Sequence, residues 1–146
     1  MPASAPVVIR FATEADAPLV LELVARLGHA VPVDADAFRV AFPTVLEDHP
    51  RSLVHIAEVD GVVAGYALTT INPLLYTNGP SAQLQEIVVD EDMQTSGVGT
   101  ALVRAVEEAC RENGVTQLTV ASRRAGGFYD RLGYTQQAEY MRRLFT

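Results

Sequence analysis

Residues 87–102 read IVVDEDMQTSGVGTAL, which is an apolar strand, a short acidic loop and a helix that opens on two glycines. Gly97 and Gly99 permit a tight turn and leave the backbone amides uncovered. The unpaired N–H groups and the positive dipole end of the helix then point at whatever lies above them. The stretch therefore predicts a binding site for a phosphate or a pyrophosphate.

The kind of phosphate ligand is limited by what this stretch lacks. A dinucleotide fingerprint, G-x-G-x-x-G, needs glycine or alanine at position 102, which is Leu102, and the Gly-Lys-Ser/Thr of a P-loop is absent. A dinucleotide-binding oxidoreductase also predicts an all-parallel sheet, whereas Asp60-Gly61 between two β-rich runs is a strong hairpin signal. Both common nucleotide-binding interpretations are therefore weakened.

Length and composition favour one domain over residues 1–146. A hydrophobic fraction of 49% with 20% charged residues supplies a core without disulfides or metal. Such a chain folds alone or as a small homo-oligomer, of which a homodimer is the simplest. The single Cys110, without a Cys/His cluster at zinc spacing, predicts a reducing compartment and no metal. Without a leader-like N-terminus or a membrane-length apolar run, we predict a cytoplasmic protein with no membrane partner.

The net charge of −7 disfavours nucleic acid as a partner and favours cationic ligands. The simpler interpretation is that a mild acidic excess keeps the protein soluble, and substrate steering is the alternative.

Periodicity predicts the element order β, α, α, β, β, β, α, β, α, β. Thr13-x-x-Asp16 resembles a capping box, Asp34 is placed to cap the second helix, and Pro43 is expected to break or kink that helix before Glu47. The hairpin is antiparallel and the later strand, helix, strand unit is parallel, so the sheet is mixed. The strands are predicted at 7–11, 52–59, 62–71, 82–89 and 115–121, with one or two more within 134–145, and the helices at 13–27, from 34, at 97–113 and at 127–132.

Two motifs carry a resemblance to a known family. Gln94-x-x-Gly97-x-Gly99 looks like the Q/R-x-x-G-x-G/A acyl-coenzyme A signature of the GNAT superfamily of N-acetyltransferases. Residues 127–134, GFYDRLGY, resemble the F-Y-x-x-x-G-F/Y element of the same family, and the element order is similar to its fold through essentially the whole length. The resemblance implies an α/β fold: a mostly antiparallel sheet, a splayed parallel pair at the fourth and fifth strands, and about four flanking helices.

The resemblance also implies how acetyl-CoA binds. The strand before the loop carries a bulge and splays from the next strand, so that its free backbone groups hydrogen-bond the pantetheine. The loop holds the pyrophosphate through main-chain amides, and a backbone N–H near Val88 serves as oxyanion donor. The implied binding residues are Ile87, Val88, Val89, Gln94, Thr95, Ser96, Gly97, Val98, Gly99, Thr100 and Ser122.

The chain departs from the family pattern in this loop. Thr95 and Ser96 stand where the family often has Arg or Lys, so phosphate binding would depend on amides, hydroxyls and the helix dipole. Arg123 and Arg124 either supply the missing charge or are ordinary surface arginines. Ser122 replaces an asparagine that is often found after the fifth strand.

Tyr129 is the predicted general acid toward the departing thiolate. In family members with this motif the hydroxyl lies near the coenzyme sulfur, and a phenol stays protonated at neutral pH because its pKa lies above that of a thiol. The alternative is that Tyr129 only packs beside Phe128.

Glu86 is the candidate base, directly or through water. By strand alternation it is expected to share a face with Leu84 and Val88, among apolar neighbours. A structural carboxylate or a contact to a cationic substrate are the alternatives. His55 is expected to be a core residue rather than a base. Three aromatic residues are expected to line the acceptor pocket or to belong to the core: Phe42, Tyr66 and Tyr76.

These observations predict an N-acetyltransferase that moves acetyl directly from acetyl-CoA to a primary amine. The acceptor is a small amine, polyamine, aminoglycoside, amino acid, or a peptide or protein amine. The alternative is a non-catalytic acyl-CoA-binding sensor or interaction module.

Overall fold

The computed structural model describes residues 6–27, 31–93, 97–122 and 127–145, and their strands form one sheet in the order β1-β2-β3-β4-β5. Neighbours from β1 to β4 are antiparallel, and β4 and β5 are parallel. The predicted mixed sheet is therefore confirmed. The strands are β1 (Val7–Phe11), β2 (Ser52–Val59), β3 (Val62–Pro73), β4 (Pro80–Val89) and β5 (Gln117–Val120).

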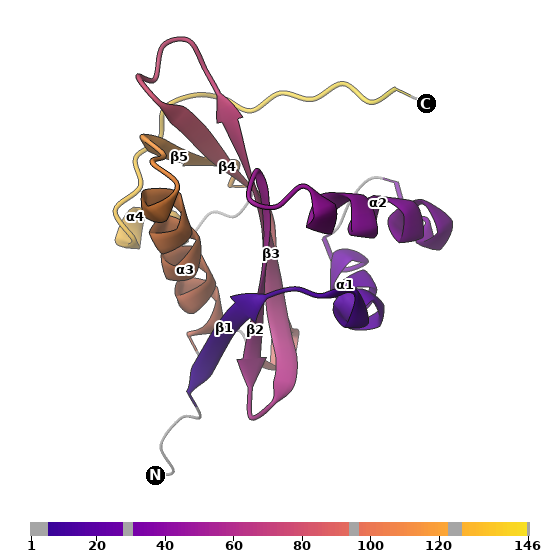
Figure 1. Cartoon of the computed structure of the whole chain (residues 1–146). Coiled ribbons are helices and arrows are strands. Elements are labelled where there is room, and N and C mark those ends of the chain that lie inside the picture. Colours follow the sequence, from indigo (N-terminus) through magenta and orange to yellow (C-terminus); the bar gives the residue numbers. More distant parts are fainter. Residues whose placement is uncertain (1–5, 28–30, 94–96, 123–126, 146) are drawn as a thin grey trace.

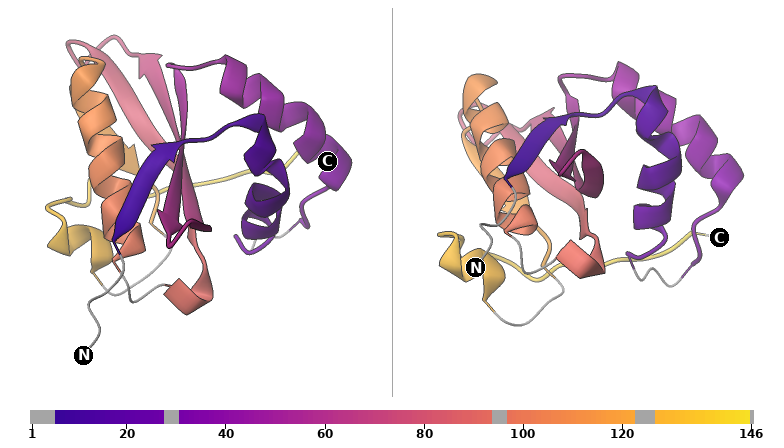
Figure 2. Two further views of the ribbon diagram at one scale, coloured as in Figure 1. Left: turned by 60° about the horizontal axis from the view of Figure 1, so that its bottom comes forward. Right: turned by 90° about the horizontal axis from the view of Figure 1, so that it is seen from below.

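Helices cover both faces of this sheet. In Figures 1 and 2, α3 and α4 lie on one side, and α1 and α2 lie on the other. The helices are α1 (Ala17–Val24), α2 (Ala35–Glu47), α3 (Val98–Glu112) and α4 (Phe128–Arg131), with short 3-10 turns η1 (Glu14–Asp16) and η2 (Glu91–Met93).

Each face of the sheet has its own hydrophobic cluster. Leu102 and Val106 of α3 are fully buried in the first cluster, together with Ala67 of β3. Tyr66, the neighbour of Ala67, is buried in the second cluster under α1 and α2. Successive side chains of a strand point to opposite faces, so β3 contributes to both clusters. Cys110 lies buried on the first face, which confirms it as a small core residue, and its pKa is raised to about 11, mainly by burial.

Local signals correctly placed the hairpin and a helix start. Asp60 and Gly61 both have positive φ, 53° and 74°, as the two-residue turn between β2 and β3 requires. The Asp34 side chain accepts a hydrogen bond from the Asp36 amide and caps α2.

Of the break or kink predicted at Pro43, the break is wrong, because α2 continues through it to Glu47. Phe42 is buried in the second cluster, and its ring stacks on Phe38 one turn earlier at 5.2 Å. Burial of Phe42 in the second cluster stabilises α2 by more than the loss of the one helical hydrogen bond that a proline removes.

The predicted final strands are also wrong, because residues 134–145 form neither strand nor helix. A strand needs a neighbour to bond its backbone, and within the described chain no segment pairs with these residues. We call residues 135–145 the C-terminal arm. It is exposed throughout.

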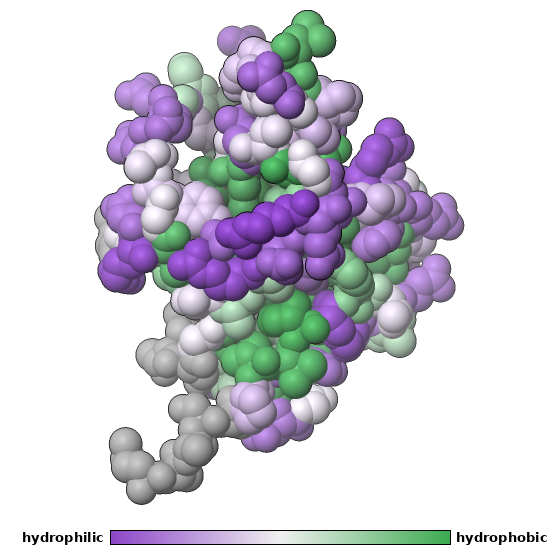
Figure 3. Space-filling view, turned by 60° about the vertical axis from the view of Figure 1, so that its left-hand side comes forward, coloured by the Kyte–Doolittle hydropathy of each residue, from purple (hydrophilic) through white to green (hydrophobic). Residues whose placement is uncertain are grey.

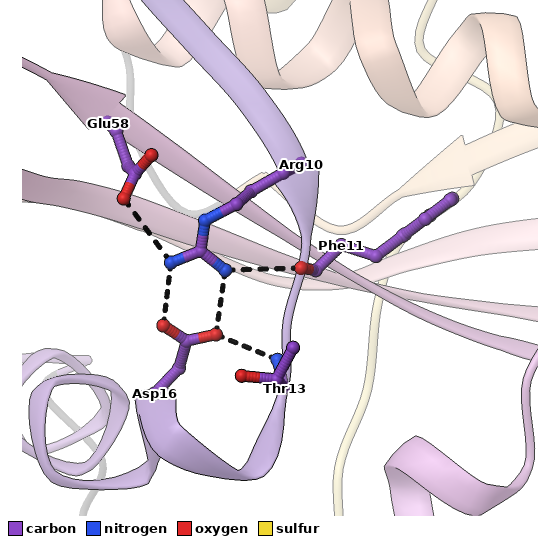
Figure 4. Close-up of polar contacts among 5 residues, drawn as sticks. All are labelled: Arg10, Phe11, Thr13, Asp16 and Glu58. Atoms are coloured by element: carbon purple, nitrogen blue, oxygen red, sulfur yellow. Dashed lines mark hydrogen bonds and ion pairs between the residues drawn. The ribbon is translucent and has the colours of Figure 1, made fainter. Parts of the chain in front are cut away.

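An ion pair fastens β1 to the turn before α1 (Figure 4). Arg10 donates two hydrogen bonds to the carboxylate of Asp16, at 2.8 and 2.7 Å, and one at 3.4 Å to Glu58. Asp16 also accepts from the Thr13 amide at 2.7 Å, as the predicted capping box requires. The Arg10 guanidinium lowers the pKa of Asp16 despite the burial of the carboxyl.

We expect Asp16→Ala to lower the free energy of unfolding by about 2 kcal/mol, because Arg10 and the Thr13 amide lose a buried acceptor. Asp36→Ala is the control, since it removes an exposed pair with Arg39 and should cost less than about 0.5 kcal/mol. Urea unfolding measures both. Equal losses in the two variants would contradict the role of the buried pair.

Candidate active site

A bulge in β4 decides which side chains reach each face of the sheet. Glu86 is opposite Leu68, but Leu84 is opposite Thr69, so Gln85 is the extra residue. Leu84 therefore lies in the cluster under α3, whereas Val88 lies in the cluster under α1 and α2. The expectation that Leu84, Glu86 and Val88 share one face is wrong, because the bulge reverses the alternation between Leu84 and Glu86.

The pairing of β4 with β5 ends at the same place. Their register runs only from Ser81 opposite Gln117 to Leu84 opposite Val120. β4 itself continues for five more residues to Val89 while staying paired with β3. Among the described residues, no strand pairs with the other side of this stretch, which we call the free edge of β4 (residues 85–89). The bulge implied by the resemblance is therefore present, and the pairing of β4 with β5 ends beside it, where β5 itself ends at Val120.

The backbone groups of Ile87 and Val89 point toward this free edge. The Asp90 amide donates to the Ala64 carbonyl at 2.7 Å, so hydrogen-bonded pairs with β3 fall at every second residue from there. By this alternation Val88 bonds to β3, and its own N–H is not directed at the free edge. The expected pantetheine contacts therefore fit Ile87 and Val89 better than Val88.

The start of α3 lies on the loop that follows β4. Gly97 is the N-cap with φ of 80°, and among the described residues no side chain caps the helix. The first backbone bond of the helix joins the Ala101 amide to the Gly97 carbonyl at 3.0 Å, so the amides of residues 98–100 lie outside the helical ladder. Val98 is fully buried, and only its backbone can serve a ligand, whereas Thr100 is exposed.

A hollow of about 970 Å³ lies beside β5 and holds two predicted site residues, Ser122 and Tyr129. We call it the β5 hollow. The Tyr129 ring packs edge-on against Phe128 at 5.0 Å and Tyr134 at 5.7 Å. Tyr134 in turn donates to Glu107 of α3 at 2.6 Å. The ring of Tyr129 is thus held between its neighbours. The hollow is lined by Gln83 and by residues 118–122, 127–130 and 134–142.

Glu86 lies on the opposite face of the sheet from Tyr129. The Tyr66 hydroxyl donates to Glu86 Oε1 at 2.7 Å, and Tyr66 is only 2% exposed. Burial and the nearby carboxylate strongly raise the pKa of Tyr66, so it remains a donor. Glu86 itself is half-buried. The sequence analysis missed this pair, because it depends on the register across the bulge.

The remaining residues that the sequence singled out differ in how deeply they are buried. Phe42 is buried in the second cluster and Tyr76 is 76% exposed. His55 is 4% exposed and contacts the Phe11 ring at 4.9 Å, which confirms a core position. Burial, with a smaller contribution from His49, lowers the pKa of His55 to about 4. Gln94, Thr95, Ser96, Arg123 and Arg124 lie outside the described residues.

We predict that His55 makes the protein less stable in mild acid. Its pKa is about 4 when folded and about 6.5 when unfolded, so the unfolded chain takes up the proton first. Stability is therefore full above pH 6.5 and falls as the pH drops toward 4, by about 2 kcal/mol at pH 5. Urea midpoints at pH 7.5 and 5 measure this loss. His55→Leu should remove most of it and His49→Gln should retain it; an undiminished loss in His55→Leu would refute the assignment.

The described residues contain no group of three or more His, Cys, Asp or Glu side chains that could hold a metal ion. They also contain no helix long and apolar enough to cross a bilayer.

Comparison with known proteins agrees with this geometry. The family model described as "Acetyltransferase (GNAT) family" matches residues 22–134. The chain therefore belongs to the GNAT acetyltransferase family. No curated protein matches the sequence.

Solved structures share the fold at low sequence identity. A transcriptional regulator from Bacillus halodurans C-125 has a TM-score of 0.86 at 22% identity, covering 96% of this chain and 100% of that one. Glucosamine-6-phosphate N-acetyltransferase from Arabidopsis thaliana has a TM-score of 0.82 at 19% identity, covering 97% of this chain and 99% of that one. An aminoglycoside acetyltransferase from an uncultured soil metagenomic sample has a TM-score of 0.70 at 18% identity, covering 96% of this chain and 95% of that one.

Proposed function

We propose that this protein is an N-acetyltransferase that moves the acetyl group of acetyl-CoA directly to a primary amine. The observation that carries the proposal is the free edge of β4, which begins where β4 and β5 stop pairing and leads toward the start of α3 at Gly97. This arrangement offers backbone groups to an extended amide-containing chain and amides to its phosphates. Family membership is the second support.

The residues present fit acetyl-CoA. Ile87 and Val89 would bond the pantetheine, and the amides of residues 97–100 would bind the pyrophosphate, with Gln94, Thr95 and Ser96 completing the loop. A ligand bound there supplies an activated thioester. Ser122, which lines the β5 hollow, would also contact the pantetheine. Direct evidence for this site would be calorimetric binding of acetyl-CoA.

Tyr129 would act as the general acid. Its ring is fixed by Phe128 and Tyr134, and it lines the β5 hollow. At neutral pH a phenol carries its proton and can deliver it to a thiolate. The Glu107–Tyr134 hydrogen bond links this ring stack to α3, the helix whose first turn is the proposed phosphate site.

Tyr129→Phe should lower kcat by roughly 100-fold, because the proton donor is lost while the ring packing remains. The Kd for acetyl-CoA should stay within about twofold. Thiol release over a panel of amines measures turnover, and calorimetry measures binding. Tyr76→Phe, a change at an exposed tyrosine, is the control and should leave both unchanged. Binding without turnover in the unaltered protein would instead favour the acyl-CoA sensor.

Glu86 would accept the proton of the amine on the other face of the sheet. The hydrogen bond from Tyr66 holds its carboxylate in place beneath α1 and α2. Tyr66 is therefore a positioning residue in this proposal. Glu86 and Tyr129 lie on opposite faces of the sheet. A thioester bound along the free edge of β4 would lie between the two faces, where it could be reached by both side chains.

The Tyr66–Glu86 pair is testable by a double-mutant cycle. Glu86→Gln should lower kcat by roughly 100-fold and Tyr66→Phe by roughly 10-fold. The double variant should be no slower than Glu86→Gln alone, since Tyr66 acts only through Glu86. Gln85→Ala, which removes only an exposed hydrogen bond from the Gln85 side chain to Thr70, is the control. Simple additivity of the two losses would show that Tyr66 supports only the fold.

The acceptor is proposed only as a class. The two acetyltransferases of similar fold are named for glucosamine-6-phosphate and for aminoglycosides, both amine-bearing small molecules. With a net charge of −7, the chain favours a cationic small amine or a peptide amine. A cytoplasmic location stays a prediction, with which the buried single thiol Cys110 agrees.

A further inference from the structure

The carboxylate of Glu86 has no counter-ion in the part of the chain that the structure describes. It accepts a hydrogen bond from the Tyr66 hydroxyl, and none of the ion pairs between described residues includes it. A half-buried carboxylate loses part of its hydration, and a cation that pairs with it offsets this loss. Glu86 is therefore placed to receive a positively charged group from a ligand.

Apolar side chains surround Glu86 on this face of the sheet. Leu68 lies directly opposite it on β3, and Val88 follows it on β4. Both residues belong to the second cluster, together with the half-buried ring of Phe38 on α2. A ligand whose positive group reaches Glu86 therefore places the rest of its body against hydrocarbon surface.

The arginines of the first two thirds of the chain are already paired with carboxylates. The chain has no lysine, and residues 1–93 contain four arginines against 13 acidic residues, a net charge of −9, whereas residues 94–146 have +2. All four arginines lie within 3.5 Å of a carboxylate oxygen of the same chain. The four pairs are Arg10–Asp16, Arg26–Asp90, Arg39–Asp36 and Arg51–Asp48. A carboxylate or phosphate on a ligand would have to compete with these acids for its cation.

The helices that cover this face have the same excess of acid. Together η1, α1 and α2 contain five acidic residues and one arginine, Arg39, which pairs with Asp36. At an effective dielectric constant of about 20, two like charges about 10 Å apart repel enough to weaken binding roughly 10-fold. An anionic group on a ligand is therefore disfavoured beside Glu86, and again by the helices above it.

We propose that the acceptor is a small monoamine with an apolar, uncharged body, and that amines bearing a carboxylate or a phosphate are rejected. This inference rests on the proposed function, which places the acceptor amine at Glu86. The ammonium group pairs with Glu86, and the body contacts Leu68, Val88 and Phe38. Burial of an aromatic ring of about 150 Å² raises affinity roughly 100-fold or more. A second positive charge against an exposed carboxylate gains less than about 10-fold, so the apolar body is favoured over a polyamine.

Binding of matched amines tests this class directly. The probes are phenethylamine, the same amine with a para carboxylate, and the same amine with a para carboxamide; the substituent is remote, so the amine itself hardly changes. Proton NMR titration gives each Kd, without and with coenzyme A, which has no acetyl group to transfer. The carboxamide should bind at least about 10-fold more tightly than the carboxylate. Phenethylamine should bind more tightly than spermidine, and Glu86→Gln should weaken its binding roughly 10-fold.

Thr70→Arg supplies the cation that this face lacks. Thr70 lies two residues after Leu68 on β3, so it shares the same face, and it accepts an exposed hydrogen bond from Gln85 at 2.9 Å. The variant should bring the Kd of the carboxylate to within about twofold of the carboxamide. Leu75→Arg is the matched control, because it adds the same charge at the fully exposed tip of the β3–β4 hairpin and should keep the 10-fold difference. Figure 3 shows hydrophobic residues at the top of the molecule, where this hairpin ends in Figure 1.

Three results would overturn the proposal: equal binding of the carboxylate and the carboxamide, tighter binding of spermidine than of phenethylamine, or no binding of phenethylamine that depends on Glu86. Thiol release with acetyl-CoA then separates this inference from the proposed function. Acetyl transfer to all three probes with equal kcat/KM would retain the acetyltransferase and refute the acceptor class. Binding in the expected order without any acetyl transfer would retain the amine site and refute the enzyme.

Discussion

The bulge at Gln85 is the constraint on which the arrangement of the candidate site depends. It shifts the register of β4 against β3 by one residue, so that the side chains beyond it change faces. Glu86 therefore meets Tyr66 instead of joining Leu84 in the cluster under α3. The same residue marks the point where the pairing of β4 with β5 ends. One inserted residue thus both redirects the carboxylate and begins the free edge of β4.

The two clusters give the two sides of the site different mechanical support. On the α3 side, Leu102, Val103 and Val106 are fully buried against the sheet, and Tyr134 ties the Tyr129 ring to Glu107. On the α1 and α2 side, the support is the smaller second cluster and the Arg10–Asp16 ion pair at the start of α1. The Tyr129 face is accordingly fastened along a fifteen-residue helix, whereas the Glu86 face is covered by two shorter helices.

Local chemistry made much of this fold predictable. The turn at Asp60-Gly61 and the cap at Asp34 depend on a few adjacent residues, and both were placed correctly. The two glycine-containing motifs identified the family that the comparison then established. In contrast, the face of Glu86 depends on a register set by β3, twenty residues away in sequence. The continuation of α2 through Pro43 depends on packing of Phe42, and the arm has no partner within its own chain. These three features are set by contacts that a local pattern does not contain.

The start of α3 has a consequence for how specificity is divided in this molecule. Gly97 has no side chain and Val98 faces the core, so these two residues can offer a ligand only their main chain. Every residue type carries the same amide, so in the proposed function substitutions of exposed side chains around this turn leave the recognition of a diphosphate largely intact. In that proposal the selectivity for the amine lies with side chains beneath α1 and α2. A chain with this backbone could then change its acceptor while keeping the same acetyl donor.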